Sequence, residues 1–185
     1  MIHTPVLIVG GGPVGLNLAL NLAWWDTPCL LVNDNENTPN HPQGNSHNAR
    51  TMEHYRRLGI ANTIRKVGLP PDHCGDAIFV TRINSYEIGR IKLPTNRERV
   101  TPGFSELDIT PEPTHRASQM YVEAILKEHA QNQSQIDLRF GCRMLEFSDN
   151  EDHVVASIEQ ISTGEMAEIN CKFMVACDGA NSSIR

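Results

Sequence analysis

A glycine turn near the N-terminus constrains the fold more strongly than any other feature of this sequence. Residues 6–9 form an apolar run of the length expected for a parallel strand that is buried on both faces. The motif Gly10-x-Gly12-x-x-Gly15 follows this run directly. Glycines at these three positions permit a sharp turn, the close approach of a phosphate to the backbone, and tight packing of helix against strand. The motif therefore predicts a β-α-β unit that binds a dinucleotide.

The residues after the turn fit the rest of such a unit. Pro13 suits the first turn of a helix, where its missing N–H would have no partner, and Val14 follows it. An apolar helix is expected to end near residues 24–26, and residues 29–32 have the pattern of a second strand. The helix N-terminus would offer free N–H donors and a partial positive charge to a pyrophosphate group.

The tip of the second strand departs from the usual dinucleotide pattern. An acidic residue normally stands there and accepts hydrogen bonds from the ribose hydroxyls, whereas this chain has Asn33. Asparagine can accept one hydrogen bond through its carbonyl oxygen but lacks the negative charge. We therefore expect weaker ribose binding unless the adjacent Asp34 substitutes for the missing carboxylate.

Farther along the chain, the spacing of apolar residues predicts two more helices and several strands. The polar loop of residues 33–48 is long and is therefore expected to be functional. We expect helices at residues 49–58 and 116–130, a hairpin of residues 77–81 and 87–93, an irregular connector at 94–114, strands at 136–140, 144–147, 154–161 and 166–172, and a buried strand at 173–177. Gly59 stands where a left-handed helix cap is expected. The fold class is therefore α/β.

Composition argues against several classes of function. The chain has 185 residues and a formal net charge of −6, which disfavours binding to nucleic acid or to an anionic membrane surface. Its apolar runs are far shorter than the ~20 residues of a membrane span, and its first residues lack the pattern of a secretory signal. Because the five cysteines are odd in number and scattered, we expect no disulfide framework and a cytoplasmic location. The spacing of the histidines predicts no metal site.

Four segments carry a resemblance to a known family: residues 9–16 at the glycine turn, 50–59, 118–123 and 177–185. They occur in the order seen in single-component FAD-dependent aromatic hydroxylases. The chain resembles the superfamily of phenol hydroxylase and para-hydroxybenzoate hydroxylase. The last segment is the most specific of the four, because the pattern Asp178-Gly179-x-x-Ser182-x-x-Arg185 follows an apolar strand as it does in that family.

The resemblance implies a fold, a cofactor and a reaction. The fold would be a Rossmann-like FAD-binding domain with an antiparallel β-meander and an inserted β-hairpin that belongs to the substrate domain. Residues 1–75 and 115–185 would form the split FAD-binding domain, and residues 76–114 would begin the substrate-domain sheet. FAD would be the cofactor and NADPH the co-substrate, and the reaction would be the hydroxylation of a small aromatic compound by molecular oxygen.

The resemblance also implies roles for single residues. Gln119 would lie beside the pyrophosphate or ribityl chain of the flavin, and Gln43 stands where many relatives have an arginine. Arg50 would either reach a phosphate or pair with a nearby glutamate, Glu53 or Glu123. The Asp178 carboxylate would order water or a backbone N–H, because it cannot favour a bare phosphate. The complete set of candidate cofactor-binding residues is Gly10, Gly12, Pro13, Val14, Gly15, Asn33, Asp34, Gln43, Arg50, Gln119, Asp178, Gly179 and Arg185.

The length of the chain limits what the resemblance predicts. Family members are about twice as long or longer, and their third flavin motif, Gly-Asp, would come after Arg185. We therefore expect an N-terminal portion or a truncated product, and the sequence names no catalytic residue, substrate or oligomeric state. Two alternatives stay open: a flavin-binding protein without catalysis, and an NAD(P)-binding dehydrogenase or reductase, which the glycine turn alone allows.

Overall fold

The computed structural model describes residues 1–41, 43–99, 101 and 110–184. It divides into two compact units. The first comprises Met1–Gly44 and Gln119–Arg185, and the second comprises Asn45–Ser118. The assignment of residues 76–114 to a substrate domain stays a prediction. Of the helices that the structure describes, none has the length and apolar character needed to cross a membrane.

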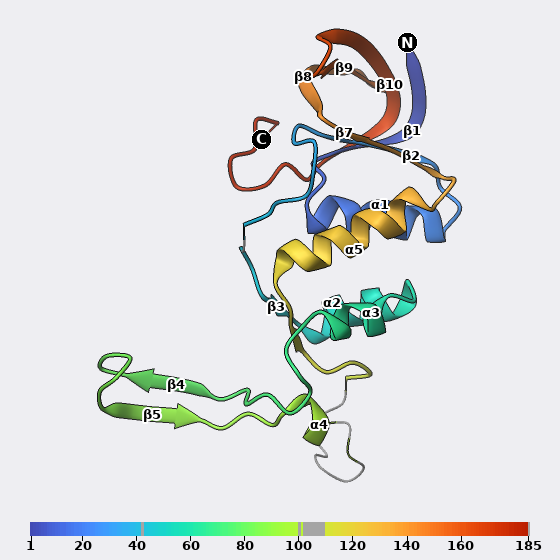
Figure 1. Ribbon diagram of the computed structural model, residues 1–185. Coiled ribbons are helices and arrows are strands. Elements are labelled where there is room, and N and C mark those ends of the chain that lie inside the picture. The colour runs from blue at the N-terminus through green and yellow to red at the C-terminus, as the bar shows by residue number, and fades with distance from the viewer. Residues whose placement is uncertain (42, 100, 102–109, 185) are drawn as a thin grey trace. The chain divides into compact units, whose positions relative to one another are not determined.

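The first unit is built on a mixed β-sheet with helices against one side (Figure 1). Its six strands have the order β7-β2-β1-β10-β9-β8. Pairing is parallel from β7 to β10 and antiparallel between β10, β9 and β8. The elements are β1 (Ile2–Val9), α1 (Pro13–Trp24), β2 (Cys29–Asn33), α5 (Gln119–Gln131), β7 (Ile136–Phe140), β8 (Cys142–Asp149), β9 (Val154–Gln160) and β10 (Glu165–Ala176). The predicted β-α-β unit, meander and α/β class are therefore confirmed.

One prediction about the last strands is wrong. Residues 166–172 and 173–177 were expected to form two strands, but they lie in the single strand β10. Its first part, Glu165–Cys171, pairs antiparallel with β9, while Ile169–Ala176 pairs parallel with β1. The strand therefore pairs with β9 along its first part and with β1 along its second part. Its apolar pattern changes between these parts although the backbone stays continuous.

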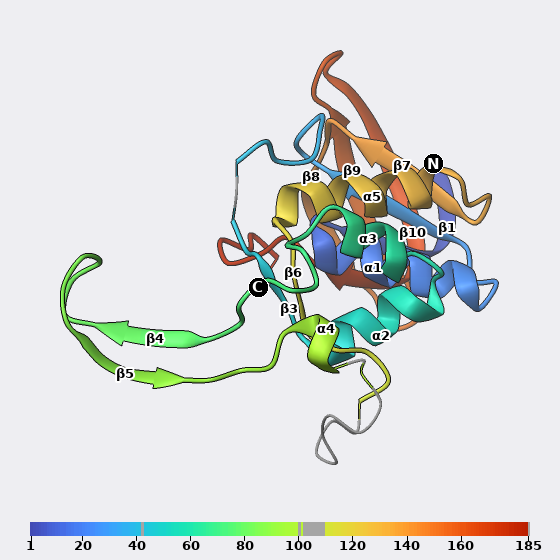
Figure 2. The ribbon, with the colours of Figure 1, turned by 60° about the horizontal axis from the view of Figure 1, so that its bottom comes forward.

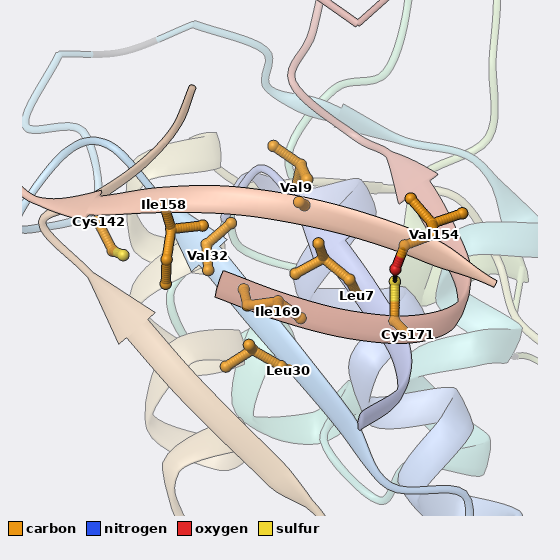
Figure 3. Packing of buried hydrophobic residues seen from close by; sticks show 10 residues of the cluster. Leu7, Val9, Leu30, Val32, Cys142, Val154, Ile158, Ile169 and Cys171 are labelled. Atoms are coloured by element: carbon orange, nitrogen blue, oxygen red, sulfur yellow. Dashed lines mark hydrogen bonds between the residues drawn. The ribbon is translucent and has the colours of Figure 1, made fainter. Parts of the chain in front are cut away.

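The core of the first unit lies on both faces of its parallel strands. Leu7 and Val9 of β1, together with Leu30 and Val32 of β2, belong to a buried cluster with side chains of the meander, including Ile158 (Figure 3). Since successive side chains of a strand point to opposite faces, the intervening residues of β1 and β2 face the helices α1 and α5. Each fully buried aliphatic side chain contributes about 1.5–3 kcal/mol through removal from water. The two covered faces explain why these strands are apolar throughout.

The second unit contains short elements and an extended hairpin. Its elements are β3 (Ser46–His47), α2 (Ala49–Arg57), α3 (Ala61–Lys66), β4 (Ala77–Val80), β5 (Glu87–Ile91), α4 (Asn96–Arg99) and β6 (His115–Arg116). The predicted hairpin is confirmed by the antiparallel pairing of β4 and β5 (Figure 2). The side chain of Asn48 caps α2 by accepting from the Thr51 N–H at 2.8 Å, and Gly59 has the expected positive φ of 78°. The pattern of apolar residues did not predict α3, α4, β3 or β6.

Two buried histidines of the second unit predict a loss of stability in acid. Burial lowers the pKa of His47 and of His115 below the usual 6.5, and the charge of Arg65 adds to the effect at His115. Because the folded-state pKa lies below the unfolded-state pKa, the stabilising contribution is present above pH 6.5 and is lost as the pH falls through the folded-state value. We expect the urea midpoint to fall between neutral pH and pH ~5, and to fall less in His115→Gln. An equal fall in that variant would contradict the prediction.

Candidate functional site

The glycine turn joins β1 to α1 in a backbone arrangement that tolerates no side chain at two of its positions. Gly10 has a φ of 112°, and its N–H donates to the carbonyl of Val32 at 2.8 Å. A Cβ atom on Gly10 would lie 2.3 Å from the carbonyl oxygen of Cys177, and a Cβ on Gly15 would lie 1.9 Å from the carbonyl oxygen of Gly10. The two glycines therefore permit the close packing of turn, helix and neighbouring strand that the motif predicted.

Gly12 differs from these glycines because its environment is open. It is the N-cap residue of α1 with a φ of −76°, and an added Cβ would meet no atom within 4 Å. No side chain of the described residues caps this helix, whose first turn begins with Pro13. The Leu16 N–H is the first that the helix satisfies, by donating to the Gly12 carbonyl at 3.0 Å. The preceding N–H groups, on Val14 and Gly15, have no intrahelical partner and can face an anion.

The open side of the turn faces a cavity of about 870 Å³ within the first unit. It lies at the carboxyl ends of parallel strands, which is where open α/β sheets bind ligands. Ten of the predicted residues line it: Gly10, Gly12, Pro13, Val14, Asn33, Asp34, Gln43, Gln119, Asp178 and Gly179. Gly15 is not among the lining residues and packs against the Gly10 carbonyl. Arg50 belongs to the second unit, where it donates to Glu53 at 2.8 Å, and Arg185 lies outside the described residues.

Asn33 supports the glycine turn with both ends of its carboxamide. Its Oδ1 accepts from the Gly11 N–H at 2.8 Å, and its Nδ2 donates to the Asn35 carbonyl at 3.1 Å. A carboxylate could not make the second bond because it has no N–H. Asp34 is exposed at the cavity, where its Oδ1 accepts from Asn35 at 3.0 Å. The carboxylate of Asp34 therefore stands beside the position that lacks the usual acid.

We expect the substitution Asn33→Ala to destabilise the first unit in the absence of any ligand. It removes the acceptor for the Gly11 N–H and the donor for the Asn35 carbonyl, at a cost of roughly 1–2 kcal/mol. Urea unfolding would measure the effect, with Asn40→Ala, an exposed asparagine of the same loop, as the control. Equal midpoints for the two variants would show that Asn33 does not support the turn.

The Asp178 turn closes the cavity from the end of β10. The Asp178 carboxylate accepts from the Ser182 hydroxyl at 2.7 Å and from the Ser183 N–H at 3.0 Å, which confirms that it binds a backbone N–H. Burial opposes ionisation of Asp178, but these hydrogen bonds outweigh it and lower its pKa. Gly179 has a φ of 84°, a conformation that L side chains rarely adopt. The carboxylate therefore organises its own loop.

Comparison with known proteins identifies the family to which this site belongs. A family model described as "FAD binding domain" matches residues 3–185. The chain belongs to this family. Membership confirms the predicted FAD-binding fold and the choice of FAD as the cofactor, and it accounts for the dinucleotide geometry of the glycine turn.

The most similar relatives of this FAD-binding chain include named monooxygenases. It is 34% identical to FAD-dependent monooxygenase apdD of Emericella nidulans over 97% of this chain and 29% of apdD. It is 27% identical to 2,4-dichlorophenol 6-monooxygenase of Delftia acidovorans over 100% of this chain and 31% of that relative. The rebeccamycin biosynthetic enzyme RebC, solved with reduced flavin, is 40% identical with a TM-score of 0.86, over 100% of this chain and 34% of RebC. The chain thus spans about a third of the length of these relatives.

The described residues fit FAD in three respects. The cavity of about 870 Å³ falls within the usual range for ligand sites, roughly 300–1,000 Å³. The open space beside Gly12 leaves room for a pyrophosphate at the N-terminus of α1. Gln119 and Gln43 also line the cavity and bring uncharged amides to its wall. The FAD cavity therefore offers N–H donors to phosphate and polar groups to hydroxyls.

Sequence reasoning missed three residues that shape the FAD cavity. Gly11 occupies a variable position of the motif, yet an added Cβ would lie 2.7 Å from the Phe140 ring and 2.8 Å from Asn33. Phe140 lines the cavity and carries the Lys127 ammonium group 4.0 Å from its ring centroid. Glu123, also in the wall, is 1% exposed. The glycine run hinted at Gly11, and Glu123 was named only as a possible partner of Arg50, whereas Phe140 gave no signal beyond its place in a predicted strand.

Proposed function

We propose that this chain forms the FAD-binding part of a monooxygenase that hydroxylates a phenolic or related aromatic compound, with NADPH and molecular oxygen as co-substrates. One observation carries the proposal: the glycine turn and the Asp178 turn line the same cavity at the carboxyl ends of parallel strands. The relatives support the chemistry by their names, one of which specifies a chlorinated phenol. Monooxygenation is also the reaction of the family that all four motif segments resemble.

In this proposal the residues of the chain bind and orient FAD. The N–H groups of Val14 and Gly15 would bind the pyrophosphate, and the Asp34 carboxylate would accept from the adenosine ribose in place of Asn33. Gln119 would lie beside the ribityl chain or the pyrophosphate. FAD, when bound, would supply the redox chemistry between NADPH and oxygen. The chain's contribution is a polar grip on one side of the cofactor and exclusion of water from it.

The first test of the proposal is the cofactor extracted from the purified protein. We expect a visible absorption band near ~450 nm, as for any oxidised flavin, and chromatography that identifies the flavin as FAD. Recovery of a nicotinamide nucleotide without any flavin would overturn the proposal and favour the alternative of an NAD(P)-dependent dehydrogenase or reductase.

The second test is NADPH oxidation in air with a panel of phenols. We expect at least one phenol to accelerate NADPH consumption and to yield a product that is heavier by one oxygen atom. FAD binding without phenol-dependent NADPH consumption would instead support the alternative of a flavin-binding protein without catalysis. Product analysis by mass spectrometry separates hydroxylation from the release of hydrogen peroxide.

A further inference from the structure

Glu123 is a buried acid in the wall of the FAD cavity without a stabilising charge. It lies one helical turn after Gln119 on α5, and it is 1% exposed. Its Oε1 accepts from Gln119 Nε2 at 2.6 Å, while its Oε2 is buried and has no hydrogen-bond partner among the described residues. Within the same residues no cation forms an ion pair with Glu123. The nearby Lys127 is directed to Phe140 and to the Glu36 carbonyl.

These surroundings make ionisation of the acid costly. Removing a carboxylate from water without a compensating charge is expensive. Burial accordingly raises the pKa of Glu123, and the hydrogen bond from Gln119 opposes this effect only in part.

The hydrogen bond to Glu123 determines how the Gln119 carboxamide is oriented. Nε2 donates to Glu123 and also to Gln43 Oε1 at 3.2 Å, so Oε1 is left to accept from the Gly44 N–H at 3.1 Å. A reversed carboxamide would place its NH₂ group against the Gly44 N–H and its oxygen against Glu123 Oε1. Both of those contacts would be repulsive, donor against donor and acceptor against acceptor. Glu123 therefore selects one of the two orientations.

The oriented carboxamide anchors a segment that forms part of the cavity wall. We call residues 34–41 and 43–44 the strap, which leads away from β2 (Figure 1). Gly44 is held from two directions, because its N–H donates to Gln119 Oε1 and its carbonyl accepts from the Gln119 N–H at 2.8 Å. The cavity is lined by strap residues that include Asn37, Thr38, Pro39 and Gln43. Displacing Gly44 would therefore move one wall of the cavity.

We propose that Glu123 acts as a positioning residue, which orients Gln119 and thereby holds the strap against the FAD cavity. The proposal rests on FAD binding as the function of the cavity. It assigns Glu123 no contact with the cofactor, since Oε1 accepts from Gln119 and Oε2 is buried. Its effect on FAD affinity passes through the Gln119 carboxamide.

The test compares FAD dissociation constants, measured by quenching of flavin fluorescence, for variants of the purified protein. Glu123→Gln keeps an accepting side-chain oxygen and has the same shape, so we expect an affinity within about threefold of the parent. Glu123→Leu removes the acceptor, and we expect roughly tenfold weaker binding with faster release of FAD. Glu128→Gln changes an exposed glutamate of the same helix and serves as the matched control.

A double variant shows whether the effect passes through Gln119. We expect Gln119→Leu combined with Glu123→Leu to bind FAD no more weakly than Gln119→Leu alone, because the two residues act in one chain of contacts. Fully additive losses would overturn the proposal, as would parent-like affinity in Glu123→Leu. An affinity of Glu123→Gln as low as that of Glu123→Leu would also overturn it, because Glu123→Gln keeps the accepting side-chain oxygen that the proposal requires.

One measurement without FAD keeps the proposal testable if Glu123→Leu does not fold or if the parent protein binds no flavin. Hydrogen exchange of the Gly44 N–H should be slow in the parent and in Glu123→Gln. Fast exchange in the parent would show that the strap is not held, whatever the cavity binds.

Discussion

Replacement of Gly15 with alanine is expected to unfold the FAD-binding unit or to lower its free energy of unfolding by about 3 kcal/mol or more. The new Cβ would lie 1.9 Å from the carbonyl oxygen of Gly10, a separation that no pair of unbonded atoms tolerates. The backbone of the turn cannot shift easily away from the new Cβ, because hydrogen bonds hold it. The Gly10 N–H donates to Val32 at 2.8 Å, and the Cys177 N–H donates to Val9 at 2.7 Å.

Fluorescence of the two tryptophans at the end of α1 offers a local probe of this substitution. Trp24 is the last residue of the helix that Gly15 packs onto the sheet, Trp25 is its C-cap, and both are exposed in the folded unit. Urea unfolding followed at these residues should show a lower midpoint in Gly15→Ala and a small change in Gly12→Ala, where an added Cβ meets no atom within 4 Å. Unchanged stability in Gly15→Ala would mean that helix and turn do not pack as described.

The sequence predicted the parts of this fold that depend on local rules. The glycine spacing, the strand of continuous apolar residues and the helix beginning at Pro13 together determined the β-α-β unit, because each rests on neighbouring residues. The split of β10 into two strands was wrong because its pattern depends on which strand pairs with it, β9 or β1. The helix α3 has six residues, which is too short for a clear helical period.

The sequence predicted those residues of the site that belong to a motif. The turn residues and Asp178 were found because their residue types and spacing carry their chemistry. Asn33 was interpreted as a weakened ribose ligand, whereas its contact with the Gly11 N–H joins residues 22 positions apart and supports the turn. Glu123 was considered as a partner for Arg50. Its bond to Gln119 joins residues one helical turn apart on α5, but its burial depends on the packing of other segments around the helix, which no local pattern encodes.

Gly12→Ala is expected to weaken FAD binding without impairing folding. The substitution leaves the backbone unstrained, because φ is −76° and the new Cβ contacts no protein atom within 4 Å. Gly12 lines the cavity at the N-terminus of α1, so the methyl group would occupy space that the pyrophosphate needs to reach the helix N–H groups. Loss of about two such hydrogen bonds to a charged group should weaken FAD binding by roughly a hundredfold, equivalent to about 3 kcal/mol.

Titration of FAD into the purified protein, followed by flavin fluorescence, measures this effect. Gly89→Ala supplies the matched control, because an alanine Cβ at this hairpin glycine also meets no atom within 4 Å and the residue lies in the other unit. We expect Gly89→Ala to bind FAD like the parent, and circular dichroism to show parent-like secondary structure for both variants. Binding of FAD by Gly12→Ala within about twofold of the parent would place the pyrophosphate elsewhere. The helix N-terminus would then have no part in holding the cofactor, and the free N–H groups of Val14 and Gly15 would have to be satisfied by water.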